Sequence, residues 1–96
     1  MNTDIKKYPI FILVKGRLIQ TDKIKSTKDY NHLFYELHHF IPQTLRKNKP
    51  EEYKKIEHLQ KLILLEKDIH RSLPNYTPER CKTITGLDKE ELLYRR

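Results

Sequence analysis

The sequence has little cysteine, little glycine and no long apolar run, and each shortage excludes a class of protein. A single cysteine, Cys81, can form neither an internal disulfide nor a zinc knuckle built on cysteine pairs, which fits a reducing cytoplasm. Two glycines in 96 residues leave no flexible linker, so we expect a single domain over residues 1–96. No stretch approaches the roughly 18 apolar residues of a membrane-spanning helix, and the N-terminus does not resemble a signal peptide. These absences predict a cytoplasmic protein without a membrane partner.

Charge is abundant and mostly positive. Charged residues make up 34% of the chain and hydrophobic residues 36%, so the apolar core must be small. The formal net charge of +7 makes a polyanion, and nucleic acid first, the expected partner. Residues 1–28 carry seven basic and two acidic residues, a net charge of +5. These lysines either contact phosphates or protect the edge of a solvated hairpin, and the sequence leaves both open.

Local patterns predict a mixture of short strands and helices. Two β-rich runs flank Lys15-Gly16 and predict a hairpin over residues 10–20. Residues 26–35 have helical spacing behind Ser26 or Thr27 as N-cap, which predicts a short helix leading into a strand. Over residues 36–41 helical and extended patterns fit equally well, and Pro42 ends either element.

The second half predicts more helix. Polar residues 43–49 predict a loop, with Asn48 as the cap of a helix of about three turns that begins at Pro50. Residues 62–65 predict a buried strand or the end of that helix. Leu65, Ile69 and Leu73 are spaced as one helical face, and Pro74 ends that helix.

Near the C-terminus, the residues that mark helix ends are clear. Thr77 and Pro78 predict a helix start, and Gly86 predicts its end. Asp88 and Glu91 predict a capping box for a last helix.

Two adjacent histidines lie in the segment that carries the chemistry. Residues 36–42 are Glu-Leu-His-His-Phe-Ile-Pro, and residues 61–70 are Lys-Leu-Ile-Leu-Leu-Glu-Lys-Asp-Ile-His. The first segment resembles the E-x-H-H-x-x-P signature of HNH endonucleases, which have the ββα-metal or His-Me finger fold. The second resembles their next motif, an Asn and an apolar run followed by His or Asn nine residues after the first Asn. The resemblance implies an α+β fold: a small ββα-metal finger over about 34–73, with an N-terminal β-hairpin and C-terminal helices.

The resemblance also implies roles for three histidines. His38 and His70 would bind one divalent metal ion, usually magnesium, and His39 would be the general base that activates water for DNA hydrolysis. The residue chemistry agrees, because histidine has an unperturbed pKa of about 6.5 and can accept a proton near neutral pH. Adjacent strand residues point to opposite faces, so His38 and His39 can serve one site only where the strand ends.

Three further residues have supporting roles in this prediction. Glu36, or Glu66 one turn before His70, would supply a carboxylate or orient a ligand. Lys61 occupies the position of the family's Asn, whose amide holds the loop. Imidazole ligands suit manganese, zinc or nickel better than magnesium, so we expect manganese to support activity at least as well as magnesium. His32 and His58 are expected to be structural or surface residues.

Basic residues between the two motifs are candidates for nucleic-acid contacts. A solvated helix face explains them equally well, because glutamates are interspersed among them. The candidates are Arg46, Lys47, Lys49, Lys54 and Lys55.

The sequence therefore predicts a metal-dependent endonuclease that cuts or nicks DNA. Two alternatives remain: a catalytically inactive finger, such as a phage-type inhibitor of a partner nuclease, and a basic nucleic-acid-binding accessory protein. Lys61 favours the inactive finger. The oligomeric state and any partner protein are not predicted.

Overall fold

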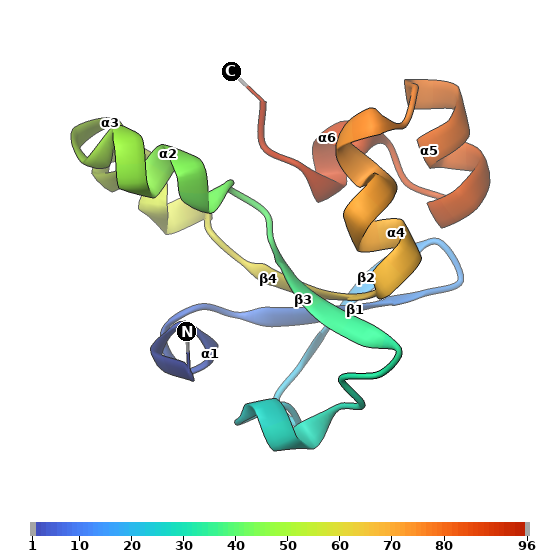
Figure 1. The fold of residues 1–96 in the computed structure, drawn as a ribbon, viewed down its shortest axis with the longest axis horizontal. Coiled ribbons are helices and arrows are strands. Elements are labelled where there is room, and N and C mark those ends of the chain that lie inside the picture. The colour runs from blue at the N-terminus through green and yellow to red at the C-terminus, as the bar shows by residue number, and fades with distance from the viewer. Residues whose placement is uncertain (1, 96) are drawn as a thin grey trace.

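Four short strands form one mixed sheet at the centre of an α+β fold (Figure 1). The computed structural model describes residues 2–95, with side chains from residue 4. The strands are β1 (Ile10–Val14), β2 (Arg17–Thr21), β3 (Tyr35–His39) and β4 (Leu62–Glu66). Their spatial order is β2-β1-β4-β3, in which β1 and β4 are parallel and the other two pairs are antiparallel.

The predicted N-terminal hairpin is confirmed. Lys15 and Gly16 connect β1 to β2 with φ values of 48° and 74°, both in the left-handed region. A two-residue turn with positive φ at both positions matches the twist of the flanking strands. The dipeptide therefore determines the register of this hairpin locally.

The segment before Pro42 is extended. β3 ends at His39 and pairs with β4, so that His38 lies opposite Ile63 and His39 opposite Leu62. The apolar run of β4 is buried on both faces because β4 is a central strand, which resolves residues 62–65 as a strand.

Across residues 2–95, six short α-helices and three 3-10 turns lie around the sheet. The helices are α1 (Asn2–Lys7), α2 (Gln43–Asn48), α3 (Pro50–Ile56), α4 (Lys67–Ser72), α5 (Pro78–Thr85) and α6 (Lys89–Leu92). The 3-10 turns are η1 (Thr27–Asp29), η2 (Glu57–Leu59) and η3 (Leu73–Asn75). Figure 1 shows α4, α5 and α6 on one side of the sheet and α1 and η1 on the other. Within residues 2–95 no helix is long and apolar enough to cross a membrane.

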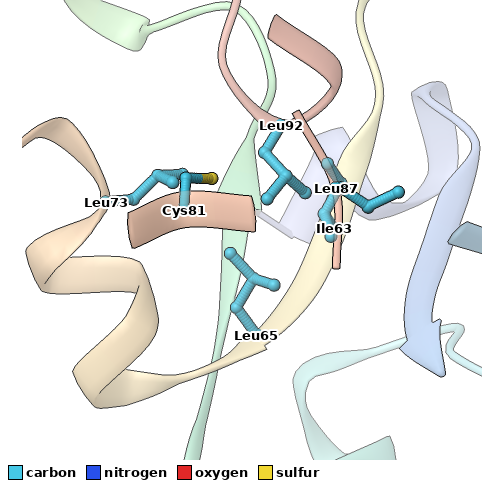
Figure 2. Packing of buried hydrophobic residues seen from close by; sticks show 6 residues of the cluster. All are labelled: Ile63, Leu65, Leu73, Cys81, Leu87 and Leu92. Carbon is cyan, nitrogen blue, oxygen red and sulfur yellow. The ribbon is translucent and has the colours of Figure 1, made fainter. Parts of the chain in front are cut away.

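Each face of the sheet has its own apolar cluster. We call the cluster under the last three helices the C-terminal core; it comprises Ile63, Leu65, Leu73, Cys81, Leu87 and Leu92 (Figure 2). The N-terminal core comprises Ile5, Tyr8, Ile10, Ile24 and Leu62. β4 contributes to both, because successive side chains of a strand point to opposite faces.

Several helix predictions need correction. Residues 43–49 are not a loop, because residues 43–48 form α2, and Gln, Leu, Arg and Lys are good helix formers. The predicted helix over residues 26–35 is only the turn η1, where Ser26 and Asp29 form a capping box. Residues 30–34 form the loop before β3.

Helix ends were predicted with mixed success. Pro50 does begin α3, but Asn48 is not its cap; Lys49 precedes the helix without a side-chain cap bond. At α5, Thr77 caps the start and Gly86, at φ 80°, ends the helix, as predicted. The capping box at Asp88 is wrong, since its side chain makes no cap hydrogen bond.

Candidate active site

His38, His39 and His70 line one open pocket of about 460 Å³. The first two come from the end of β3 and the third from α4. The remaining lining residues are Pro42, Gln43, Thr44, Pro74 and Leu93. The chain order around the pocket is strand, strand, helix, because β3 pairs with β4 and α4 follows β4 directly. The three histidines of the sequence motifs therefore meet in space.

His38 is buried on the face of the C-terminal core. Its Nε2 lies 2.6 Å from the carbonyl oxygen of Leu92, to which it donates. Burial, with smaller contributions from the nearby rings of His70 and His39, lowers the pKa of His38 to about 4, although the Leu92 carbonyl opposes the shift. His38 is therefore neutral near pH 7, and its Nδ1 carries a lone pair.

His70 meets the same face of β3. Its Nδ1 lies 2.9 Å from Oε1 of Glu36, and the other carboxylate oxygen, Oε2, accepts from Arg71 at 3.2 Å. The bond to His70, and then the contacts to Arg71, lower the pKa of Glu36. Glu36 and His38 are two residues apart on one strand face, so both reach α4. The ring centroids of His38 and His70 are 5.1 Å apart.

His39 points toward the N-terminal helix. Its Nε2 lies 3.0 Å from Oδ2 of Asp4, and its side chain is 15% exposed. Asp4 also accepts from both terminal nitrogens of Arg46, at 3.3 and 3.0 Å. The hydrogen bonds from Arg46, with a smaller contribution from His39, lower the pKa of Asp4 to about 2 despite burial. The Gln43 amide nitrogen lies 2.9 Å from the same Nε2 and 3.4 Å from Nδ1 of His39. Because an Nε2 that donates to Asp4 cannot accept, this amide can donate only to Nδ1.

All three rings share one arrangement. One nitrogen of each faces a fixed acceptor: a carbonyl for His38, Glu36 for His70 and Asp4 for His39. A neutral imidazole that donates from one nitrogen has its lone pair on the other. Metal-binding histidines are typically oriented in this way, and so are histidines that act as bases.

The donor set fits a divalent ion that keeps open positions. Metal–imidazole bonds are about 2.0–2.1 Å long, so two rings on one tetrahedral ion have centroids roughly 5 Å apart. The His38–His70 centroid separation of 5.1 Å is compatible with a shared ion and is equally the usual spacing of an edge-to-face ring contact. Among the described residues no group of three His, Cys, Asp or Glu side chains could hold a metal ion. The remaining positions would belong to water or to phosphate oxygens.

Comparison with protein-family models, curated proteins and solved structures finds no match to this chain. No family is therefore established by similarity. The roles of the site residues rest on the contacts and chemistry of the described side chains.

Gln60 is a site residue that the sequence analysis missed. Its Oε1 accepts from the Ile41 backbone nitrogen at 2.8 Å, and its Nε2 donates to the Ile41 carbonyl at 3.0 Å. The same Nε2 donates to the Tyr53 hydroxyl at 3.3 Å. The amide thus holds the backbone directly after the histidine pair. The sequence did contain a hint: the family motif has an Asn at the position of Lys61, and the amide of Gln60 lies one residue before it.

Lys61 and Glu66 lie away from the polar contacts of the histidines. The ammonium of Lys61 sits over the ring of Phe40, 4.7 Å from its centroid. The expectation that Glu66 shares a helical face with His70 is wrong, because Glu66 is the last residue of β4. It is exposed and borders a different pocket, beside Phe34. Of the two glutamates considered, Glu36 is the one that contacts a histidine.

The basic candidates divide into two groups. Arg46 is tied to Asp4 and is only partly exposed. The other four are exposed: Lys47, Lys49, Lys54 and Lys55. Lys47 and Lys49 border hollows that share Thr44 with the histidine pocket. Lys54 borders a separate hollow with His58. His58 and His32 are both exposed and outside the histidine pocket, and His32 contacts the carbonyl of Thr27.

Proposed function

We propose that this protein is a metal-dependent endonuclease with a ββα-metal finger that hydrolyses DNA phosphodiester bonds. His39 is the general base, and His38 and His70 are the metal ligands. The observation that carries the proposal is the single pocket on a strand-strand-helix unit into which all three histidines are brought. The other four hollows described above are each lined by at most one histidine.

The histidines suit the chemistry of phosphodiester hydrolysis. His39 takes a proton from water, because its second ring nitrogen carries the lone pair while Nε2 donates to Asp4. His38 is neutral near pH 7, as an imidazole ligand must be. A bound divalent ion would supply positive charge next to the phosphate and the leaving oxygen. Glu36 fixes the ring of His70.

The imidazole ligands also bear on the choice of metal. Magnesium prefers oxygen ligands, whereas manganese, zinc and nickel accept nitrogen. We therefore expect manganese to support cleavage at least as well as magnesium. An assay in which magnesium works and manganese fails would contradict this ligand set.

DNA is the substrate that the charge favours. The net charge is +7, and Lys47 and Lys49 lie on hollows next to the histidine pocket.

The test is cleavage of supercoiled plasmid with magnesium or manganese. His39→Ala should lose about 10²- to 10⁴-fold in rate, the usual contribution of a positioned general base. His58→Ala is the matched control, because His58 is exposed and outside the pocket. Nicked or linear product should require metal and disappear with a chelator. Equal rates for wild type and His39→Ala would refute the proposal.

One observation favours a second candidate, the catalytically inactive finger that occupies a partner nuclease or its DNA. The described residues offer two imidazoles and no third metal ligand. Calorimetric titration with manganese addresses it: binding lost in both His38→Ala and His70→Ala, without any plasmid cleavage by the wild type, would select the inactive finger.

A further inference from the structure

We propose that Asp4 is a positioning residue for His39, which it holds through Nε2 so that Nδ1 is the nitrogen that accepts the proton. This inference rests on the proposed function. It adds to the site a residue from α1, which lies outside the segment of residues 34–73 that carries the histidine motifs.

The contact between Asp4 and His39 is built into the fold. Oδ2 of Asp4 lies 3.0 Å from Nε2 of His39, and the Asp4 side chain is only 9% exposed. Strand alternation explains why this partner comes from α1. His38 faces the C-terminal helices, whereas His39, the last residue of β3, turns its Nε2 toward the other side of the sheet, where α1 packs, while it still borders the histidine pocket.

Arg46 fixes the carboxylate that faces His39. It donates to both oxygens of Asp4, a two-point contact that prevents the carboxylate from rotating. The guanidinium lies over the ring of Tyr53, 5.5 Å from its centroid, and the Tyr53 hydroxyl contacts Gln60. Arg46 therefore supports the carboxylate that faces His39.

A charged partner for His39 has two chemical effects. It keeps the single proton of the neutral ring on Nε2, which leaves the lone pair on Nδ1. It also stabilises the imidazolium that forms once His39 has taken a proton from water. Neither effect requires Asp4 to touch substrate.

The matched pair of variants is Asp4→Asn and Glu57→Gln. Asp4→Asn keeps the shape of the side chain and removes its charge. Glu57→Gln weakens a different anchor of the same region, since Glu57 accepts from Lys7 at 2.8 Å and from the Tyr8 hydroxyl at 2.5 Å. Glu57 does not contact His39, so this variant separates loosened docking of α1 from loss of the carboxylate.

The first readout is nitrogen-15 NMR of the imidazoles in the full chain without metal. The wild type should show His39 as the Nε2–H tautomer with a slowly exchanging ring proton. That signal should vanish or move to Nδ1 in Asp4→Asn and persist in Glu57→Gln. The second readout is plasmid cleavage, in which Asp4→Asn should lose about 10- to 100-fold in kcat and Glu57→Gln should stay near wild type.

Two results would overturn the inference. One is a wild-type His39 whose ring proton exchanges freely, or a tautomer that Asp4→Asn leaves unchanged. The other is an equal loss of signal in Glu57→Gln, which would reduce Asp4 to an anchor of α1. The NMR readout does not need turnover, so an inactive wild type with the expected signal would reject the nuclease and keep the Asp4–His39 pair.

Discussion

The two faces of the sheet are stabilised in different ways. In the C-terminal core five of six side chains are at most 1% exposed, whereas in the N-terminal core only Leu62 is. The N-terminal face instead has a chain of polar contacts, in which Asp4 binds Arg46, Lys7 binds Glu57 and Tyr8 binds Tyr53. One face depends on apolar burial, and the other supplements a thinner core with charge.

The candidate site spans both faces. The proposed metal ligands His38 and His70 lie against the C-terminal core, while His39 reaches across to Asp4 on the other side. Changes in the C-terminal core should therefore unfold the protein. Changes on the N-terminal face should alter the base with a smaller loss of stability.

The largest stability loss is expected in the C-terminal core. Leu73 is fully buried in η3, next to Pro74 of the histidine pocket. Leu73→Ala should cost about 2–5 kcal/mol, because it removes apolar contacts and leaves a cavity. Ile24→Ala, at an 8% exposed position of the N-terminal core, should cost near the lower end of that range. Urea denaturation followed by circular dichroism measures both, and an equal or reversed ranking would contradict the difference between the faces.

As pH falls, the free energy of unfolding should first decrease because of His38, on the C-terminal face, and only later because of Asp4, on the N-terminal face. Unfolded His38 binds a proton below about pH 6.5, whereas burial delays binding in the folded state to about pH 4. Between these values the unfolded state binds more protons, so stability falls as pH falls, by on the order of 3 kcal/mol. Asp4, whose pKa falls from 3.8 to about 2 on folding, adds a second loss below about pH 4.

Unfolding free energies measured with a chelator from pH 7.5 to 3 would show the first loss. The loss of stability should begin about one pH unit above 6.5 and end about one unit below 4, because protonation of His38 in each state is spread around its midpoint. His38→Gln should flatten the slope between pH 6.5 and 4 and leave the loss below pH 4. A slope that survives this substitution would assign the acid sensitivity to another group.

Gln60 should matter more than its neighbour Lys61. Gln60→Leu leaves the buried backbone of Ile41 without its amide partner, which should cost about 1–3 kcal/mol and reduce cleavage. Lys61→Ala loses only the contact to the rings of Phe40 and Phe11, about 0.5–1 kcal/mol. Thermal melts and plasmid cleavage compare them. A larger effect at Lys61 would mean that Lys61, at the position of the family's Asn, holds the backbone after the histidine pair, and that the Gln60 amide does not.

Elements whose signals are local were predicted from the sequence. Lys15 and Gly16 specify their turn by themselves, and Thr77 and Gly86 mark the ends of α5 within one or two residues. The helix α2 was missed because a polar stretch with one apolar residue lacks the periodicity that predicts burial. Its residues are good helix formers, but helix propensity alone is a weaker signal than an apolar stripe.

The candidate site was predictable only where a motif spans it. His38, His39 and His70 were predicted from the resemblance to the two HNH motifs, and they border one pocket. Asp4 and Gln60 were not found, because their partners lie 35 and 19 residues away and neither belongs to a periodic pattern. Contacts of this kind depend on which sheet face each element covers, and only the folded chain determines that.

The smallest effects are expected from the exposed lysines, where the comparison is between two sides of the insert that links β3 to β4. Lys47 and Lys49 border hollows next to the histidine pocket, whereas Lys54 borders a hollow beside His58.

Each phosphate contact that is lost lowers the slope of log K against log salt by about 0.9 on duplex DNA. Replacing Lys47 and Lys49 together with alanine should therefore reduce this slope by up to about 1.8, and replacing Lys54 and Lys55 should reduce it less. Fluorescence anisotropy over a salt series measures the slope directly. Equal changes in both pairs would mean that the positive charge attracts DNA diffusely, without a path that leads to the histidines.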